Sequence, residues 1–273
     1  MKDKISLAGD LGSGKSTVAD ILISRLGAEY YSTGAIVRSI AARHGMTVVE
    51  LNVYMETHPE IDHEIDDGLK ELSKLDKPLV IDSRMAWHFT EGTFKVYLST
   101  DPETSALRIM RANRQGEHET TLEATVAQTK ARRESEKKRY MEQYGVDIKD
   151  LTNYSLVVDT TNATPDAVAE RIISSFDLWS VDREYKAAFI SAERLNFPDD
   201  EADGELIAEY SSAIESGEEL PEIQVFEEDG EFYVARGTEI ALAYAFNMAD
   251  FIPCVIIHGS VGENKYVKMK NSL

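Results

Sequence analysis

The sequence predicts an α/β protein with a parallel sheet covered by helices on both faces, followed by a small α+β unit. Short apolar runs typical of buried strands alternate with helix-period segments over the first two thirds of the chain. Parallel strands are joined by crossovers, usually helices, so this alternation indicates a parallel sheet. The 273 residues exceed the usual size of one domain, and we expect two, at residues 1–178 and 181–273.

The first of these parts is expected to contain four strands and several helices. The strands are predicted at residues 5–8, 78–82, 94–98 and 155–158. The helices are predicted at residues 15–26, over most of 33–75 with a break at 58–59, from 101 onward, at 122–144 and at 165–176. In the second part, short strands are predicted at residues 224–226, 232–234 and 255–257, with a helix at 238–247.

Acidic side chains dominate the chain and concentrate in its last third. The formal net charge is −20, and residues 181–273 hold 7 basic and 20 acidic side chains, a net charge of −13. Such a surface repels a phosphate backbone, so nucleic acid is an unfavourable partner. No apolar segment has the length of a membrane span, no export signal is recognisable, and the single Cys254 excludes a disulfide framework, so we expect a cytoplasmic location.

A glycine-rich loop stands between the first predicted strand and the first predicted helix. Residues 9–16 read GDLGSGKS and match G-x-x-x-x-G-K-[ST], the P-loop pattern, at every fixed position. Glycines there let backbone N–H groups surround a phosphate at the positive end of a helix. We therefore expect an ATP site formed by Gly9, Gly12, Ser13, Gly14, Lys15, Ser16 and Thr17.

Lys15 and Asp82 are expected to be catalytic, and Ser16 and Asp82 are expected to hold a metal ion. Lys15 reaches the β- and γ-phosphates of the nucleotide, and the Ser16 hydroxyl ligates Mg²⁺. Asp82 ends a predicted strand at the carboxyl edge of the sheet, where it can hold Mg²⁺ or receive the acceptor's proton. A carboxylate at that position can also cap the next helix, and this alternative stays open. No N-K-x-D motif follows a predicted strand, so a kinase is favoured over a GTPase.

Arginines provide the remaining candidate site. Arg132, Glu136 and Arg139 are spaced i, i+4, i+7 and share one face of a predicted helix. Two guanidinium groups held by a carboxylate can clamp a transferring phosphoryl group, although a solvated, salt-bridged surface helix is the alternative. Arg38 and Arg84 stand where a phosphorylated acceptor needs positive charge.

These segments together resemble the cytidylate kinase family, in particular its shorter, archaeal-type branch. The resemblance covers about residues 1–177 and is carried by the phosphate loop, Ser32-Thr33-Gly34 with Arg38, Asp82-Ser83-Arg84, the R-x-x-x-E-x-x-R-Y helix and Tyr144-Gly145-Val146-Asp147. It implies the nucleoside monophosphate kinase fold and phosphoryl transfer from Mg-ATP to CMP or dCMP.

The same resemblance implies roles for individual residues. Arg38 and Arg84, with Thr33 and Gly34, would bind the acceptor. Arg132 and Arg139 would bind the transferring phosphate, and Glu136 would orient the arginines. The resemblance names no residue that reads the base, so cytosine rests on the family likeness alone.

The second unit resembles the ParB/sulfiredoxin-like domain. The likeness is carried by Ile190–Leu195, Leu220–Val225, Tyr233–Thr238 and Ile252-Pro253. Acidic and apolar residues follow Gly237 where that family has arginines, so a structural, regulatory or homo-oligomerising role is expected rather than nucleotide binding. Two further functions stay open for the whole chain: a kinase acting on a metabolite or a modified base in DNA, and a nucleotide-sensing regulatory protein.

Overall fold

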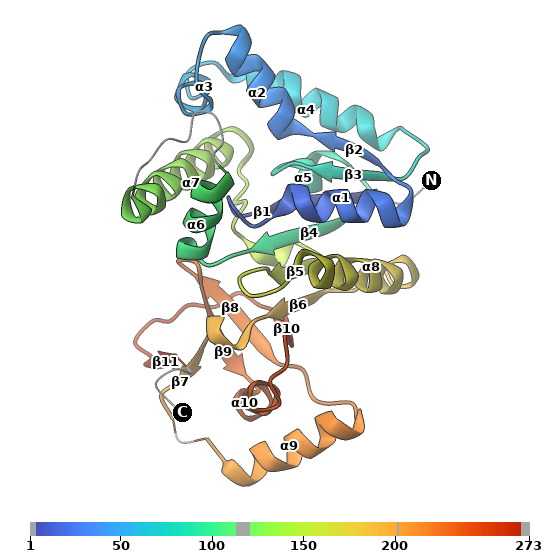
Figure 1. Cartoon of the computed structure of the whole chain (residues 1–273), viewed down its shortest axis with the longest axis vertical. Coiled ribbons are helices and arrows are strands. Elements are labelled where there is room, and N and C mark those ends of the chain that lie inside the picture. The colour runs from blue at the N-terminus through green and yellow to red at the C-terminus, as the bar shows by residue number, and fades with distance from the viewer. Residues whose placement is uncertain (1–3, 113–120, 201, 269–273) are drawn as a thin grey trace.

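One eleven-stranded sheet runs through the molecule in the order β11-β7-β9-β8-β10-β6-β5-β4-β1-β3-β2 (Figure 1). The computed structural model describes residues 4–112, 121–200 and 202–268, and all structural statements concern these residues. The strands are β1 Lys4–Gly9, β2 Glu29–Ser32, β3 Leu79–Asp82, β4 Thr93–Ser99, β5 Leu156–Asp159, β6 Ala187–Ile190, β7 Leu195–Pro198, β8 Gln224–Glu228, β9 Glu231–Arg236, β10 Ile252–Ile256 and β11 Tyr266–Lys268.

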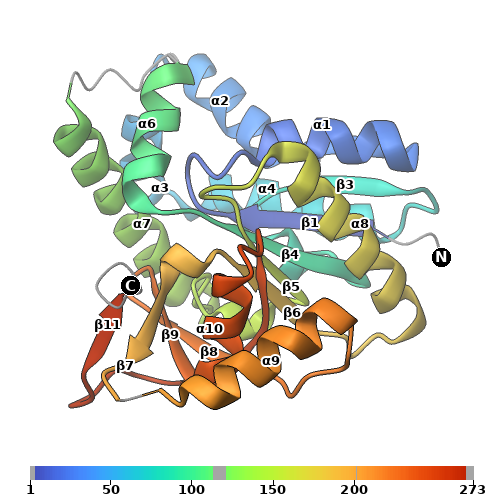
Figure 2. The same ribbon diagram turned by 60° about the horizontal axis from the view of Figure 1, so that its bottom comes forward.

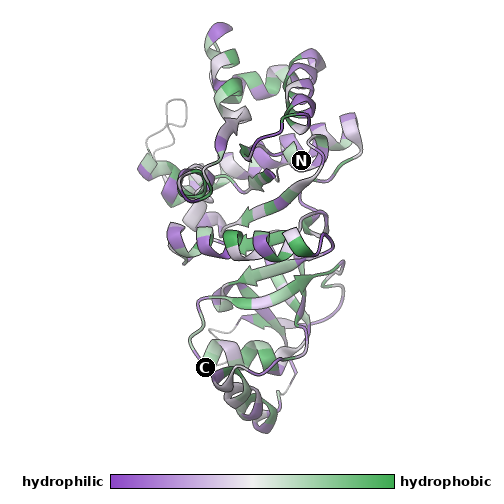
Figure 3. Cartoon of the chain, turned by 90° about the vertical axis from the view of Figure 1, so that its right-hand side faces the viewer, coloured by the Kyte–Doolittle hydropathy of each residue, from purple (hydrophilic) through white to green (hydrophobic). Residues whose placement is uncertain are grey.

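The strands from β2 to β6 are all parallel and form the first half of this sheet. Ile5 of β1 is opposite Val80 of β3 on one side and Phe94 of β4 on the other. The helices α1 (Lys15–Leu26) and α8 (Pro165–Val181) pack together over one face, and Leu22 and Trp179 belong to the core beneath them. Figure 3 shows hydrophobic and hydrophilic stripes alternating along the helices, as one-sided packing requires.

Three helices form a separate unit beside β2, at one end of the molecule (Figure 1). They are α2 (Thr33–Arg43), α3 (Val48–Met55) and α4 (Pro59–Ser73). Thr47 and Glu50 form a reciprocal capping box that fixes the start of α3. The unit has its own small core, which includes Leu51 and Ile65.

The short α5 (Ala86–Phe89), the helix α6 (Pro102–Ala112) and the long α7 (Leu122–Tyr144) complete the first part. Thr121 caps the start of α7, and Gly145, with φ +65°, ends it in the left-handed region. α7 packs against α6 and α3, so it connects α6 to the three-helix unit.

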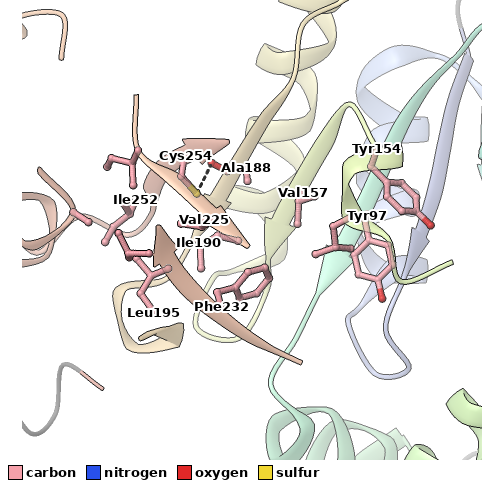
Figure 4. Close-up of a cluster of buried hydrophobic side chains, with 14 of the residues drawn as sticks. Tyr97, Tyr154, Val157, Ala188, Ile190, Leu195, Val225, Phe232, Ile252 and Cys254 are labelled. Atoms are coloured by element: carbon pink, nitrogen blue, oxygen red, sulfur yellow. Dashed lines mark hydrogen bonds between the residues drawn. The ribbon is translucent and has the colours of Figure 1, made fainter. Parts of the chain in front are cut away.

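The C-terminal segment extends the sheet instead of standing apart from it. β6 pairs in parallel with β5, and β10 pairs antiparallel with β6. Figure 4 shows the shared core, in which Tyr97, Tyr154 and Val157 of the first part lie with Leu195 and Phe232 of the second. The helices α9 (Gly204–Ser216) and α10 (Thr238–Phe246) pack on each other beside these strands (Figure 2).

A buried ion pair joins the two parts. Arg194, 4% exposed, donates to the Asp159 carboxylate at 3.2 Å and to the Gly230 carbonyl at 2.7 Å. Asp159 ends β5 and is fully buried. Removing one member of such a pair leaves a buried charge without a partner, which typically costs about 3–5 kcal/mol, so this contact holds the C-terminal segment firmly.

The predicted α/β class is confirmed, with a mostly parallel sheet and an additional C-terminal sheet region. Differences are local: β2, α5, α9, β6, β7 and β11 are not among the predicted elements, α8 extends to Val181, and β10 starts at Ile252. The division into domains at about residue 180 stays a prediction. In the described ranges, no helix is long and apolar enough to cross a membrane.

Candidate active site

The phosphate loop joins β1 to α1 and depends on glycine at two close approaches. Gly9 has φ +145°, and a Cβ there would lie 2.4 Å from the carbonyl oxygen of Leu98. Gly12 has φ +72°, and its Cβ would lie 2.6 Å from the carbonyl oxygen of Ser105. The loop therefore needs glycine for conformation and for space.

Lys15 lies against the loop that it follows. Its ammonium donates to the carbonyl oxygens of Gly9 at 2.8 Å and Asp10 at 2.7 Å. The Ser13 hydroxyl donates to the same Asp10 carbonyl at 2.8 Å. Ser16 and Thr17 stand exposed in the first turn of α1. A cation thus stands beside the loop, the position needed to neutralise phosphate charge.

Asp10 is a structural anchor of the loop that the sequence pattern did not reveal, because the pattern leaves this position free. Its carboxylate accepts hydrogen bonds from Tyr97 at 2.8 Å, Lys149 at 2.7 Å and the Thr100 N–H at 3.1 Å. Arg133 of α7 stands 3.5 Å away. Burial alone would raise the pKa of Asp10, but Lys149 and Arg133 outweigh it and hold the pKa well below its usual range.

A cleft of about 190 Å³ opens between the loop, the three-helix unit and α7. Most of the predicted site residues line it together: Gly12, Ser13, Gly14, Lys15, Ser16, Thr33, Gly34, Arg38, Asp82, Arg84, Arg132 and Arg139. Three others are not part of its lining: Gly9, Thr17 and Glu136. Residues from both ends of the first part therefore converge on one cavity.

Asp82 ends β3 inside this cleft. The Tyr30 hydroxyl donates to its Oδ2 at 3.0 Å, and the Thr33 hydroxyl donates to its carbonyl oxygen at 3.4 Å. The following helix α5 has Met85 as N-cap and no side-chain cap. The alternative that Asp82 caps the next helix is therefore wrong.

The charged face of α7 is largely buried, which contradicts the alternative of a solvated surface helix. Glu136 is 2% exposed and pairs with Arg84 and with Arg132, whose Nε is 3.1 Å from its Oε1. Arg139 is 4% exposed; its Nε lies 3.2 Å from Asp62 Oδ2. The two arginines of α7 thus have different surroundings, because Arg132 joins Arg84 while Arg139 packs on the three-helix unit.

Two carboxylates of α4 also line the cleft, and sequence reasoning did not select them. Asp62 and Asp66 are spaced i, i+4 and are 4% and 5% exposed. Burial raises the pKa of Asp66 to about 6, although a hydrogen bond from Tyr144 works in the opposite direction. The available signal was two acidic residues beside Ile61 and Ile65 in a helix whose apolar face is buried.

Arg108 of α6 is a second residue that sequence reasoning did not select. It donates to the carbonyl oxygens of Thr160 at 2.7 Å and Thr161 at 3.2 Å, and contacts the Gly12 carbonyl at 3.5 Å. It therefore connects the phosphate loop with the turn that follows β5.

A phosphate loop after a central parallel strand, facing an arginine-lined cleft beside a helical unit, defines a P-loop protein of the nucleoside monophosphate kinase type. A family model described as an AAA domain matches residues 5–144, about half of the chain. The chain belongs to the cytidylate kinase family.

Two cytidylate kinases among the curated relatives are matched over nearly their whole length. The chain is 35% identical over 184 residues to a cytidylate kinase of Archaeoglobus fulgidus, covering 67% of this chain and 99% of that protein. It is 35% identical over 195 residues to a cytidylate kinase of Halobacterium salinarum, covering 71% and 99%. Its fold is similar to that of an uncharacterized protein from Eubacterium ventriosum, with a TM-score of 0.50 at 16% identity, over 64% of this chain and 99% of the other.

Proposed function

We propose that this protein transfers the γ-phosphoryl group of Mg-ATP to CMP or dCMP, giving CDP or dCDP. The observation that carries the proposal is the shared cleft, which Lys15 lines together with Arg38, Arg84 and Arg132. Kinship with cytidylate kinases supplies the acceptor base. It does not favour a metabolite, a modified base in DNA or a purely sensory role.

In this mechanism the loop binds the donor and Lys15 stabilises its charge. An oxygen of the acceptor's phosphate forms a bond to the γ-phosphorus while the bond to the β–γ bridging oxygen breaks, and ADP leaves. Such a reaction needs positioning and charge neutralisation more than proton transfer. Gly9, Gly12, Ser13 and Gly14 shape the loop, and Lys15 accompanies the negative charge as it moves.

The arginines hold the acceptor and the group in transfer. Arg38 and Arg84 bind the acceptor phosphate beside Thr33 and Gly34. Arg132 and Arg139 bind the transferring phosphate, and Glu136 orients Arg132 and Arg84 through the ion pairs described above. Since Arg139 is paired with Asp62 in this structure, its role in transfer requires that it leave that partner.

The residues present suit a magnesium ion bound together with ATP. Ser16 and Asp82 line the same cleft, and Tyr30 engages Oδ2 of the Asp82 carboxylate. Across the described ranges no group of three or more His, Cys, Asp or Glu side chains forms a metal cage. Mg²⁺ favours one or two carboxylates, with phosphates and water completing its shell, and it would neutralise phosphate charge there.

For the C-terminal segment we propose a structural role. Its ParB/sulfiredoxin-like character, homo-oligomer formation, the cytoplasmic location and the exclusion of nucleic acid stay predictions. Support for the structural role comes from β6 on the edge of β5 and from the buried Arg194–Asp159 pair.

The test is ADP release with Mg-ATP and, separately, CMP, dCMP, UMP, AMP, GMP and dTMP. We expect turnover with CMP or dCMP, and a loss on the order of 10³-fold in kcat for Lys15→Ala, because the cation at the γ-phosphate is removed. Nucleoside diphosphate is identified directly by chromatography. Absence of diphosphate from all six acceptors would refute the proposal.

A further inference from the structure

The three-helix end of the cleft is an apolar slot with a few buried polar groups. Its apolar lining comes from α2, α3 and α4: Val37, Val48, Val49, Met55, Ile65 and Leu69. Asn52, Asp62 and Asp66 also line it and are all at least nine-tenths buried. This composition is typical of a pocket that holds a flat ring and reads its edge with polar groups.

The two carboxylates in the slot differ in what they can still bind. Asp62 is paired with Arg139 at 3.2 Å, and Gln143 also hydrogen bonds to it. Asp66 accepts a hydrogen bond from the Tyr144 hydroxyl at Oδ2. No donor in the part of the chain that the structure describes is paired with Asp66 Oδ1, although the residue lines the cavity. Among the described residues Asp62 is ion-paired with a guanidinium group and Asp66 is not, so Asp66 is the carboxylate whose charge remains available to a ligand.

A carboxylate oxygen distinguishes the two pyrimidine bases. Cytosine carries an amino group at position 4, which donates to a carboxylate, whereas uracil carries a carbonyl oxygen there. Placing that oxygen against a buried carboxylate leaves two acceptors facing each other without a proton. Unpaired buried polar groups are costly, so discrimination by such a contact is strong.

We propose that Asp66 selects cytosine over uracil by accepting a hydrogen bond from the 4-amino group of the acceptor base at Oδ1. The inference rests on the proposed function, because it concerns the base of the acceptor. Tyr144 is a positioning residue: its hydroxyl donates to Oδ2, which leaves Oδ1 to accept from a ligand in the slot. In this structure Arg139 balances the negative charge of Asp62, which reduces the repulsion between the carboxylates of Asp62 and Asp66.

The experiment compares kcat/KM for CMP and UMP in the wild-type chain, Asp66→Asn and Asp62→Asn. The side-chain amide introduced by Asp66→Asn can donate to the uracil carbonyl oxygen, so the CMP-to-UMP ratio is expected to fall about 100-fold in this variant. Asp62→Asn is the matched control one helical turn away. It is expected to change kcat/KM for CMP and for UMP by a similar factor, because Arg139 loses its ion-pair partner, and to leave their ratio within about threefold.

Each other result is decisive. An unchanged ratio in Asp66→Asn, or a ratio that moves in Asp62→Asn instead, would overturn the assignment of Asp66. Turnover of CMP by the wild-type chain supports the proposed function whatever the variants do. If the wild-type chain does not turn over CMP, the proposed function itself is refuted. If melting curves show Asp66→Asn to be unfolded, Tyr144→Phe decides, with an expected fall of about fivefold in the ratio if one hydrogen bond is lost.

Discussion

The two ends of the cleft differ in the groups that form them: backbone at the donor end and side chains at the acceptor end. At the donor end, a loop of eight residues depends on its backbone conformation, and Gly9 and Gly12 are required there by close approaches of 2.4 and 2.6 Å. At the acceptor end, side chains from α3, α4 and α7 meet across large sequence separations, as Arg139 does with Asp62. A backbone site can be recognised from a short pattern, whereas a side-chain site becomes visible only when the fold brings its parts together.

This difference also predicts how each end fails. Damage at the donor end should lower turnover of every acceptor alike, because all acceptors share one phosphate donor. Damage at the acceptor end should change the preference among acceptors. Glu136 pairs with both Arg84 and Arg132, which serve every acceptor. Its loss should therefore lower turnover of all acceptors alike.

Beyond the loss of Lys15, the largest effect on turnover is expected from Gly12→Ala. The new methyl group would meet the Ser105 carbonyl oxygen, and φ +72° is strained for alanine, so the loop must shift. We expect kcat/KM for ATP to fall about 100-fold with every acceptor, since small misplacements of the reacting groups have effects of this size. Gly27→Ala is the control, because Gly27 has φ +60° with open space around it. Equal losses in both variants would remove the close approach as the cause.

An intermediate effect is expected from Glu136→Gln. It leaves Arg84 and Arg132 without their shared carboxylate, and loss of one member of a buried charge pair costs roughly 2 kcal/mol or more, about 30-fold in kcat/KM. Glu134→Gln, an exposed change on the same helix, should be silent. Steady-state rates with CMP and UMP test this, and a change in the CMP-to-UMP ratio would argue against a shared role.

The smallest effect is a change of base preference with pH. The pKa of Asp66 is about 6, raised mainly by burial and also by Asp62, while Tyr144, Lys70 and His63 oppose the rise. Below about pH 6 the carboxylate that accepts from cytosine becomes protonated, so the CMP-to-UMP ratio of kcat/KM should fall severalfold from about pH 7.5 to about pH 5.5. CMP and UMP carry the same phosphate group, so its titration affects both values of kcat/KM equally and cancels in their ratio.

Stability does not explain such a fall. The folded pKa of Asp66 lies above its unfolded value of 3.8, so this group stabilises the fold fully below pH 3.8, and that contribution is lost as the pH rises through about 6. Its protonation therefore favours the folded state. A ratio that is constant with pH, or equally pH-dependent in Asp66→Asn, would contradict the role of this carboxylate.

The sequence predicted the donor end well because its determinants are local. The loop, β1 and α1 follow from an apolar run, a fixed glycine pattern and helical spacing, all before the end of α1 at Leu26. Asp10 was missed because its partners Tyr97 and Lys149 are 87 and 139 residues away. Asp66 was missed for the same reason, because its partner Tyr144 lies on another helix.

Strand pairing was the other limit of sequence reasoning. β2 reads Glu-Tyr-Tyr-Ser, with half-exposed residues and no apolar run, so only its partner β3 makes it a strand. The four residues of β6 give no indication that they pair with β5. The hydrophobic periodicity of a segment indicates whether it is a helix or a strand, but not which strand it pairs with. The continuity of the sheet depends on that pairing.

That continuity bears on where such a sheet can be extended. The strands of the C-terminal segment all lie on the β5 side of the sheet, whereas β1, which precedes the phosphate loop, lies between β4 and β3. An unpaired outer strand offers free N–H and C=O groups to any additional segment. A kinase of this architecture can therefore carry a segment as long as residues 181–273 on the edge of the sheet that lies away from the acceptor helices.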